Sequence, residues 1–216
     1  MSVNVIIFDF DGTLADTFEA IVGITNNLAV EFGYKPATPE EIIQVRNLSS
    51  REIVKQSGIS VFKLPFLLKR VKENLHNDIQ NLNPVLGIKE ALTQLKEKGY
   101  ILGILTSNSE ENVGVFLRKH EMKELFSFVH SAKTLFGKHT ALKKLMSSYQ
   151  WNAEEVVYVG DETRDIESSQ KINLKVIAVS WGFNSKIALA EQKPDFIIDH
   201  PSELVDLIES LQQVLI

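Results

Sequence analysis

Short apolar runs alternate with longer helical patterns along most of this chain. The runs are rich in β-branched and aliphatic residues, and they occupy residues 3–8, 100–105, 156–159, 175–179 and, more weakly, 195–198. Nearly continuous apolar runs of this length, separated by helical stretches, are typical of parallel strands that are buried on both faces. The pattern therefore predicts an α/β fold built on a parallel sheet.

Residues 15–82 interrupt this alternation. We expect helices at residues 15–32, from 39 to 46, at 49–57 and at 64–77, and no strand between them. The sheet pattern resumes after Asn83 and Pro84, where a helix at 88–98 leads into the second strand. The sequence therefore predicts an all-helical insert at 15–82 within a core made of 1–14 and 83–216. The apolar residues among 61–68 are expected to form the insert's own core.

Composition narrows the classes of function. The chain has 216 residues, of which 44% are hydrophobic and 24% charged, as in ordinary globular proteins. Its net charge of -5 argues against nucleic acid as the main partner. The absence of cysteine excludes a thiolate nucleophile and a zinc–thiolate site. The first residues fit neither a signal peptide nor a membrane span, so we expect a cytoplasmic enzyme that does not bind membranes.

Two aspartates follow the first predicted strand, in the sequence Asp9-Phe10-Asp11-Gly12-Thr13. Alternation along an extended backbone places Asp9 and Asp11 on the same side, and Gly12 permits a sharp turn. Carboxylates held this close repel each other unless they share a proton or a cation. A purely structural interpretation is that Asp11 and Gly12 form a turn and that Asp9 caps a helix. Burying a carboxylate at an apolar strand end is costly, which favours Asp9 as a nucleophile toward phosphorus and Asp11 as its acid/base partner.

A second polar cluster, Thr106-Ser107-Asn108, ends the next predicted strand and opens a helix. All three residue types are favoured helix N-caps, so capping is the first interpretation. Hydroxyl and amide groups at a helix N-terminus also form a cradle for phosphate. The cluster is therefore a candidate for both roles.

Further charged candidates follow later in the chain. Lys138 could neutralise the transferring phosphoryl group, with Lys133 as a rival. Asp161 follows the strand at 156–159, and Asp165 lies one helical turn beyond it. A lone lysine is usually a surface charge. Alone, the two aspartates are equally consistent with a cap at Asp161 and a surface charge at Asp165. Oxygen ligands from several loops, without a histidine or cysteine cluster, point to Mg²⁺ rather than zinc.

Together, these motifs resemble the four signature motifs of the haloacid dehalogenase-like hydrolase superfamily. The resemblance rests on Asp9-x-Asp11-Gly12-Thr13, Thr106, Lys138 and Gly160-Asp161-x-x-x-Asp165, and it covers almost the whole chain. It implies a three-layer Rossmann-like core with a helical cap inserted between the first two motifs.

The resemblance also implies a role for each residue. Asp9 would form an aspartyl-phosphate and bind Mg²⁺, and Asp11 would act as general acid/base while its backbone carbonyl binds the metal. Thr106 would bind phosphoryl oxygens, and Lys138 would neutralise charge. Asp161 would complete the metal site, and Asp165 would either bind the metal directly or support the residues that bind it. The substrate-binding candidates beside them are Gly12, Thr13, Ser107, Asn108 and Arg46, of which Arg46 faces either the site or solvent.

The C-terminal stretches 177–184 and 194–199 resemble those of phosphoglycolate phosphatases and their close relatives. The expected activity is therefore Mg²⁺-dependent hydrolysis of a small phosphomonoester, by a monomer or homodimer. One alternative is a sugar phosphomutase that uses the same aspartates. An alternative of another class is a non-catalytic scaffold that binds phosphate or metal.

Overall fold

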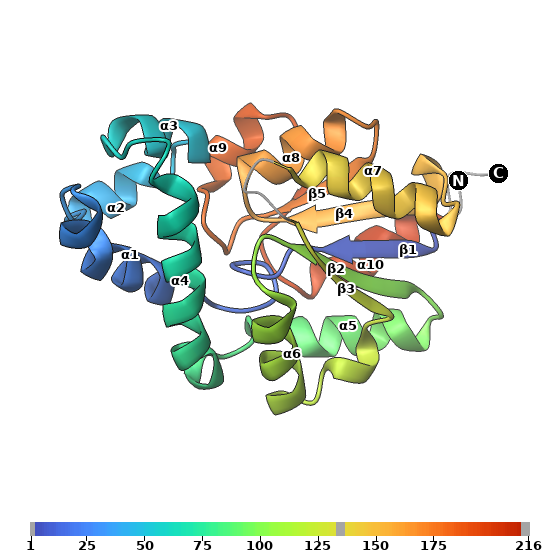
Figure 1. The fold of residues 1–216 in the computed structure, drawn as a ribbon. Coiled ribbons are helices and arrows are strands. Elements are labelled where there is room, and N and C mark those ends of the chain that lie inside the picture. Colours follow the sequence, from blue (N-terminus) through green and yellow to red (C-terminus); the bar gives the residue numbers. More distant parts are fainter. Residues whose placement is uncertain (1–2, 133–136, 213–216) are drawn as a thin grey trace.

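Six strands form one parallel sheet at the centre of the molecule (Figure 1). The computed structural model describes residues 3–132 and 137–212. The strands are β1 (Val5–Phe8), β2 (Ile101–Thr106), β3 (Phe128–Ser131), β4 (Val156–Gly160), β5 (Lys175–Val179) and β6 (Phe196–Ile198). Their order is β3-β2-β1-β4-β5-β6, so the direction of winding reverses beside β1. Ligands of such sheets bind at the carboxyl ends of the strands next to this reversal.

Helices cover both faces of the sheet and complete three layers. They are α5 (Ile88–Glu97), α6 (Glu110–Lys119), α7 (Lys138–Tyr149), α8 (Thr163–Gln170), α9 (Lys186–Glu191) and α10 (Glu203–Ser210). Ile6 and Phe8 of β1 pack into the apolar cluster that includes α5, α6 and α10. Val5 and Ile7, which point the other way, pack with α7, α8 and α9. The predicted α/β fold with a three-layer Rossmann-like core is confirmed.

The edge strand β3 was not expected from the sequence. Phe128 and Val129 are followed by His130 and Ser131, so the apolar run is too short to signal a strand. Gly103 of β2 makes room for this strand. A Cβ atom at Gly103 would lie 1.9 Å from the ring of Phe128.

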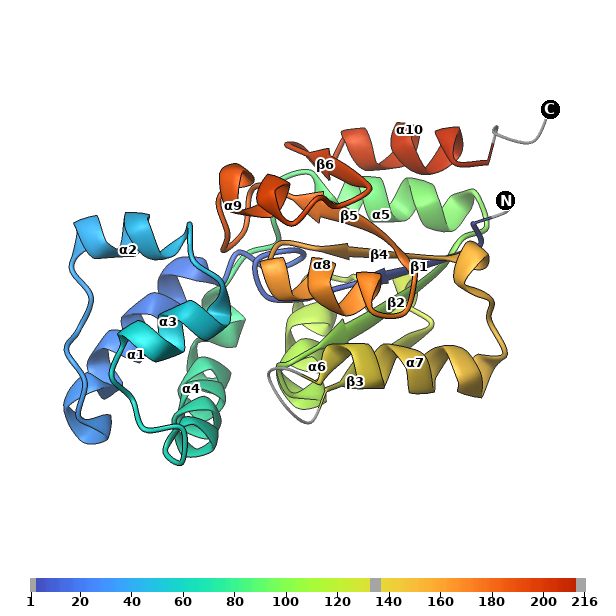
Figure 2. The same cartoon turned by 90° about the horizontal axis from the view of Figure 1, so that it is seen from above.

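Four helices between β1 and α5 form the helical insert, which lies beyond the carboxyl ends of the strands (Figure 2). They are α1 (Phe18–Phe32), α2 (Pro39–Val45), α3 (Ser50–Gln56) and α4 (Leu64–Asp78). Capping boxes start α2 at Thr38 and α3 at Ser49, and Gly33 ends α1 in the left-handed conformation. Helices α1 and α4 pack against each other.

Two expectations about the insert need correction. Helix α1 begins at Phe18 rather than at residue 15, because Ala15 forms a β-bridge with Pro84, in the segment where the chain returns from the insert to the core. The apolar stretch at 61–68 contributes only partly to the core. Leu67 is buried, whereas Phe62 is 83% exposed and Phe66 is 67% exposed.

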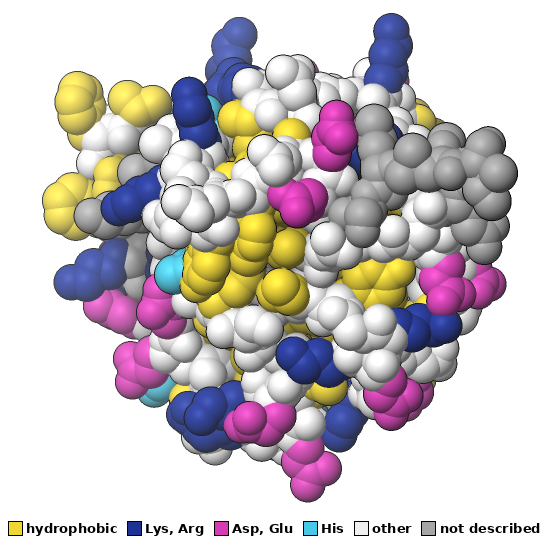
Figure 3. Space-filling model, turned by 90° about the vertical axis from the view of Figure 1, so that its right-hand side faces the viewer, with side chains coloured by type: hydrophobic (Ala, Val, Ile, Leu, Met, Phe, Trp, Pro, Cys, Tyr) yellow, Lys and Arg dark blue, Asp and Glu magenta, His cyan; other side chains and the backbone are white. Residues whose placement is uncertain are grey.

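One face of the molecule has a surface of mixed character. Figure 3 shows the side of the molecule at the amino ends of the strands, where a central group of hydrophobic side chains is surrounded by interspersed positive and negative ones. Within residues 3–132 and 137–212, no helix combines the length and apolar character needed to cross a membrane.

Candidate active site

The carboxyl ends of three neighbouring strands bring polar residues together. Asp9 follows β1, Thr106 ends β2 and Asp161 follows β4, and all three side chains are buried. The register aligns Phe8 with Val159, and the Asp9 backbone N–H donates to the Val159 carbonyl over 2.8 Å. The ends of β1 and β4 therefore lie side by side, and the aspartates that follow these two strands converge.

Lys138 joins two of the predicted carboxylates. It is the first residue of α7, and its side chain is only 1% exposed. Its Nζ lies 2.5 Å from Asp165 Oδ1, to which it donates a hydrogen bond, and 2.5 Å from Asp9 Oδ2. The contact with Asp9 is an ion pair. Asp9 Oδ2 accepts no hydrogen bond from the described residues. Lys133, the rival candidate, lies outside the described residues.

Asp9, Asp161 and Asp165 form a buried group that could hold a metal ion. One carboxylate oxygen from each lies within 4.8 Å of the others. Thr13 Oγ1 donates to one oxygen of Asp161 over 2.6 Å, which fixes this side chain. The ammonium of Lys138 pairs with two of these three carboxylates, so it offsets only part of their negative charge. Oxygen ligands with excess negative charge fit Mg²⁺, as does Asp9 Oδ2, a buried oxygen that accepts no hydrogen bond from the described residues.

The pKa values reflect this crowding of charge. Burial, with the charges of Glu162 and Asp9, raises the pKa of Asp161 well above its usual value. Burial also raises the pKa of Asp165 to about 6, against the attraction of Lys138. Burial opposes the charged form of Lys138, but Asp165 and Asp9 together raise the pKa of its ammonium. Burial therefore opposes the ionised forms of Asp161 and Asp165, which a further cation at this site would favour.

Asp11 lies beside this group and is held by Asn108. Asn108 Nδ2 donates to both carboxylate oxygens of Asp11, at 3.0 and 3.1 Å. Burial, followed by the charge of Asp9, raises the pKa of Asp11 to about 7. A carboxyl group with this pKa is poised to give and take a proton near neutral pH.

Other predicted residues shape the same space. Thr106 Oγ1 accepts a hydrogen bond from the Asn108 backbone N–H over 3.0 Å, and thus caps the turn before α6. Ser107 Oγ lies 3.4 Å from a guanidinium nitrogen of Arg164, which donates to it. Gly12 has a φ of 77°, and a Cβ there would lie 2.3 Å from Asp161 Oδ2. Only glycine therefore fits at this turn.

Arg46 lies where the helical insert meets the core. It follows α2, and its guanidinium donates to the Gly182 carbonyl over 2.7 Å. The same group stacks over Phe18 of α1, with 5.0 Å from Cζ to the ring centre. The structure therefore places Arg46 against the loop after β5.

Several residues of this region were missed by sequence reasoning. Glu162 forms an ion pair with Arg164 and accepts a hydrogen bond from Ser50 of α3 over 2.9 Å. Lys72 of α4 interacts electrostatically with Asp11, and burial lowers the pKa of its ammonium. Asn184 bonds to both the insert and the core. Of these residues, only Glu162 and Arg164 could have been singled out from the sequence, because they lie within the motif between Asp161 and Asp165.

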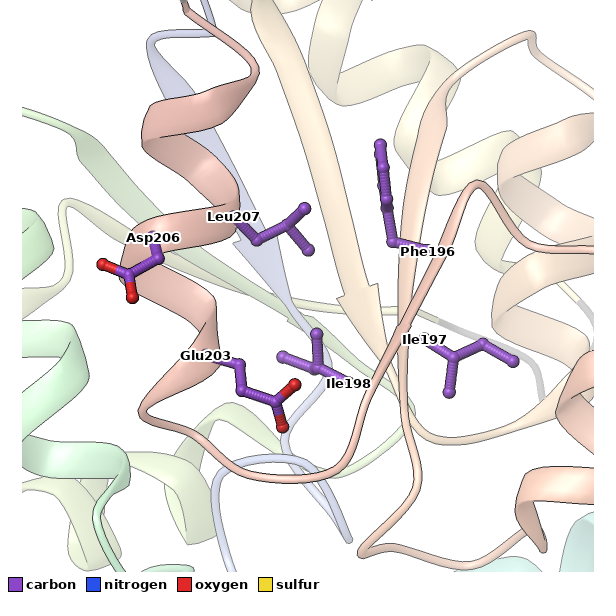
Figure 4. A pocket seen from close by; sticks show the side chains of 6 residues that line it. All are labelled: Phe196, Ile197, Ile198, Glu203, Asp206 and Leu207. Carbon is purple, nitrogen blue, oxygen red and sulfur yellow. The ribbon is translucent and has the colours of Figure 1, made fainter.

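A separate hollow of about 390 Å³ lies between β6 and α10 (Figure 4). Its lining is Phe196, Ile197, Ile198, Glu203, Asp206 and Leu207. None of these residues belongs to the aspartate group at the ends of β1 and β4. The hollow is therefore distinct from the site described above.

Comparisons with known proteins agree with this geometry. The family model described as haloacid dehalogenase-like hydrolase matches residues 6–179. The chain is 38% identical over 211 residues to a phosphoglycolate phosphatase of Synechococcus elongatus, covering 98% of this chain and 100% of the relative. It is 26% identical over 217 residues to the pyrophosphatase PpaX of Bacillus thuringiensis, covering 99% and 100%.

Solved structures share the fold. A predicted phosphatase from Clostridium acetobutylicum matches with a TM-score of 0.83 at 20% identity, over 97% of this chain and 100% of that one. The family match extends over most of the chain, from β1 to β5. This chain therefore belongs to the haloacid dehalogenase-like hydrolase family and is homologous to its phosphatases.

Proposed function

We propose that this protein is a Mg²⁺-dependent phosphatase that hydrolyses a small phosphomonoester of the phosphoglycolate type. The observation that carries the proposal is the buried set of Asp9, Lys138 and Asp165, in which one ammonium lies 2.5 Å from each carboxylate. The identity of 38% to a phosphoglycolate phosphatase along nearly the whole chain supports the substrate class.

In the first step, Asp9 attacks phosphorus, and the bond from phosphorus to the leaving oxygen breaks. Asp11 gives its proton to that oxygen, and its pKa of about 7 suits this role. In the second step, Asp11 takes a proton from water while the water attacks the aspartyl-phosphate. Inorganic phosphate leaves and Asp9 is restored.

The other residues serve charge and orientation. Asp9, Asp161 and Asp165 are the side chains that would hold Mg²⁺, and the bound ion supplies positive charge against these carboxylates and the phosphoryl group. Lys138 brings a further positive charge to the nucleophile. Thr106 and the turn that it caps lie at the start of α6, where backbone N–H groups suit phosphoryl oxygens.

The ammonium of Lys72, near Asp11, supports a leaving group that carries a carboxylate. Asp11 must face the leaving oxygen, and Lys72 of α4 interacts with Asp11 electrostatically. The positive charge of Arg164 also acts to lower the pKa of Asp11. A carboxylate close to the phosphate ester, as in phosphoglycolate, would be attracted to Lys72.

We further propose that residues 15–82 act as a cap over this site, on a core of 1–14 and 83–216. Two neighbouring backbone bonds support a hinge where the chain enters and leaves the insert. The Asp16 N–H donates to the Asn83 carbonyl, and the Val85 N–H donates to the Leu14 carbonyl, each over 3.0 Å. Closing such a cap excludes water during phosphoryl transfer.

The test is phosphate release from a panel that contains phosphoglycolate, neutral sugar phosphates and pyrophosphate, with and without Mg²⁺. We expect Mg²⁺-dependent turnover that is fastest with phosphoglycolate and is lost in Asp9→Asn. Faster conversion of a sugar 1-phosphate to its 6-phosphate would favour a mutase, and faster release from pyrophosphate would change the substrate class. No turnover of any compound by the parent would contradict the proposal.

A further inference from the structure

The helical insert touches the core next to the aspartate group, through the turn that joins α2 to α3. This turn, residues 46–49, meets the loop at 182–185 that follows β5. Arg46 donates to the Gly182 carbonyl over 2.7 Å, and the Ser185 N–H donates back to the Arg46 carbonyl over 2.8 Å. The contact is therefore made largely of directed hydrogen bonds, which a small displacement would break.

One buried side chain links this turn to the core. Asn184 is 4% exposed, and its Nδ2 donates to the carbonyls of Arg46 and Leu48, at 3.0 and 2.9 Å. Its Oδ1 accepts from the backbone N–H of Thr163 over 2.9 Å. Both amide hydrogens and the amide oxygen are thus used. The two donated bonds reach the insert, whereas the accepted bond reaches the core.

The core partner of Asn184 is the segment that carries two of the proposed metal ligands. Thr163 is the first residue of α8, between Asp161 and Asp165. The backbone N–H of Asn184 donates to the Asp161 carbonyl over 3.2 Å, and that of Phe183 donates to Asp161 Oδ2 over 2.7 Å. The position of this loop therefore depends on the same residues that hold the insert.

We propose that Asn184 is a positioning residue that couples the closed position of the helical insert to the geometry of the Asp161–Asp165 segment. The inference rests on the proposed function, which assigns those carboxylates to Mg²⁺. Moving the insert away breaks the two hydrogen bonds that Asn184 donates to it, so these bonds favour the closed arrangement. Because coupling is reciprocal, a ligand that closes the insert tightens Mg²⁺ binding, and Mg²⁺ tightens binding of that ligand.

The substitution Asn184→Asp isolates this coupling. It keeps the oxygen that faces Thr163, removes both donors and sets a negative charge against the two carbonyls of the turn. Asn26→Asp is the matched control. Asn26 Nδ2 donates to the Ala37 carbonyl over 3.0 Å, and its Oδ1 accepts from the Ala37 N–H, so both bonds stay inside the insert.

The experiment measures the dissociation constant of Mg²⁺ by titration calorimetry, with and without orthovanadate as an analogue of the phosphoryl group. We expect vanadate to tighten Mg²⁺ binding about fivefold or more in the parent and in Asn26→Asp, and clearly less in Asn184→Asp, where only the direct attraction between Mg²⁺ and vanadate remains. Asn184→Ser, which is too short to reach both carbonyls, replaces Asn184→Asp should that variant fail to fold.

The outcomes separate the two proposals. Retention of the full vanadate effect in the Asn184 variants, or its absence from a parent that binds Mg²⁺, overturns the coupling and leaves the proposed phosphatase intact. A parent that binds no Mg²⁺ overturns the proposed metal site, and the coupling with it. A smaller effect in the Asn184 variants alone supports the inference.

Discussion

The Lys138 ammonium lies 2.5 Å from Asp9 Oδ2, at the carboxyl end of β1. Both side chains are 1% exposed, so water screens this pair very little. An unpaired buried charge would be costly, and the second contact of Lys138, with Asp165, holds the ammonium in place. The pair therefore orients the proposed nucleophile.

Removing this ammonium should disable the reaction. We expect Lys138→Met to lower kcat about 100- to 1,000-fold, because a positioned charge on the transferring group is lost. Mg²⁺ binding should tighten, because a competing cation has left the carboxylates. Steady-state kinetics and calorimetry measure the two effects. Lys144→Met, at an exposed position of α7, is the control, and an unchanged kcat in Lys138→Met would count against the assigned role.

Asn108 should matter for the acid/base step. Asn108→Leu removes the donor that holds both oxygens of Asp11, so we expect kcat to fall about 10- to 100-fold. The fall should be smaller for p-nitrophenyl phosphate, whose leaving group needs no proton. Asn74→Leu, which removes an exposed amide on α4, provides the comparison. Equal losses for both substrates would argue against a link through Asp11.

Lys72 should determine preference for acidic leaving groups. Lys72→Met is expected to raise KM for phosphoglycolate about tenfold, because one partly buried attraction to the substrate carboxylate is lost. KM for a neutral sugar phosphate should change little. Lys69→Met removes an exposed lysine from the same helix and should affect neither substrate. A parallel rise for both substrates in Lys72→Met would contradict this assignment.

Gly182 should be required by the metal site. A Cβ at this position would lie 2.2 Å from Asp161 Oδ2, so Gly182→Ala must displace that carboxylate. We expect weaker Mg²⁺ binding and a loss of about 1–3 kcal/mol in the free energy of unfolding. Gly23→Ala is the control, because no atom lies within 4 Å of the added carbon, and it should stabilise α1 by about 0.5–1 kcal/mol. Calorimetry and chemical denaturation test both variants.

The sequence was informative where chemistry follows a strand. Asp9, Thr106 and Asp161 each stand at the end of an apolar run, so a parallel sheet had to bring them to one edge. Lys138 does not directly follow a strand, and its signal in the sequence was weak until the resemblance to a family favoured it over Lys133. The structure nevertheless brings it to Asp9. The catalytic roles of these residues and the boundaries of the insert stay predictions.

Other features depend on contacts that no local pattern reveals. β3 was missed because Val129 is followed by two polar residues at a sheet edge. Phe62 was expected in the core of the insert, yet it is exposed. The sequence around an apolar residue beside a turn does not show whether other side chains pack against it. Asn184 bonds to residues more than 130 positions away in the chain, so its role is visible only in three dimensions.

The most direct test of the central claim is detection of the covalent intermediate on Asp9. The enzyme is mixed with Mg²⁺ and radiolabelled phosphoglycolate, quenched with acid, and digested for mass spectrometry. We predict acid-stable label on the peptide that contains Asp9, formed and lost at rates compatible with turnover, and none in Asp9→Asn. Turnover without label on that peptide, or label that persists in Asp9→Asn, would contradict the account.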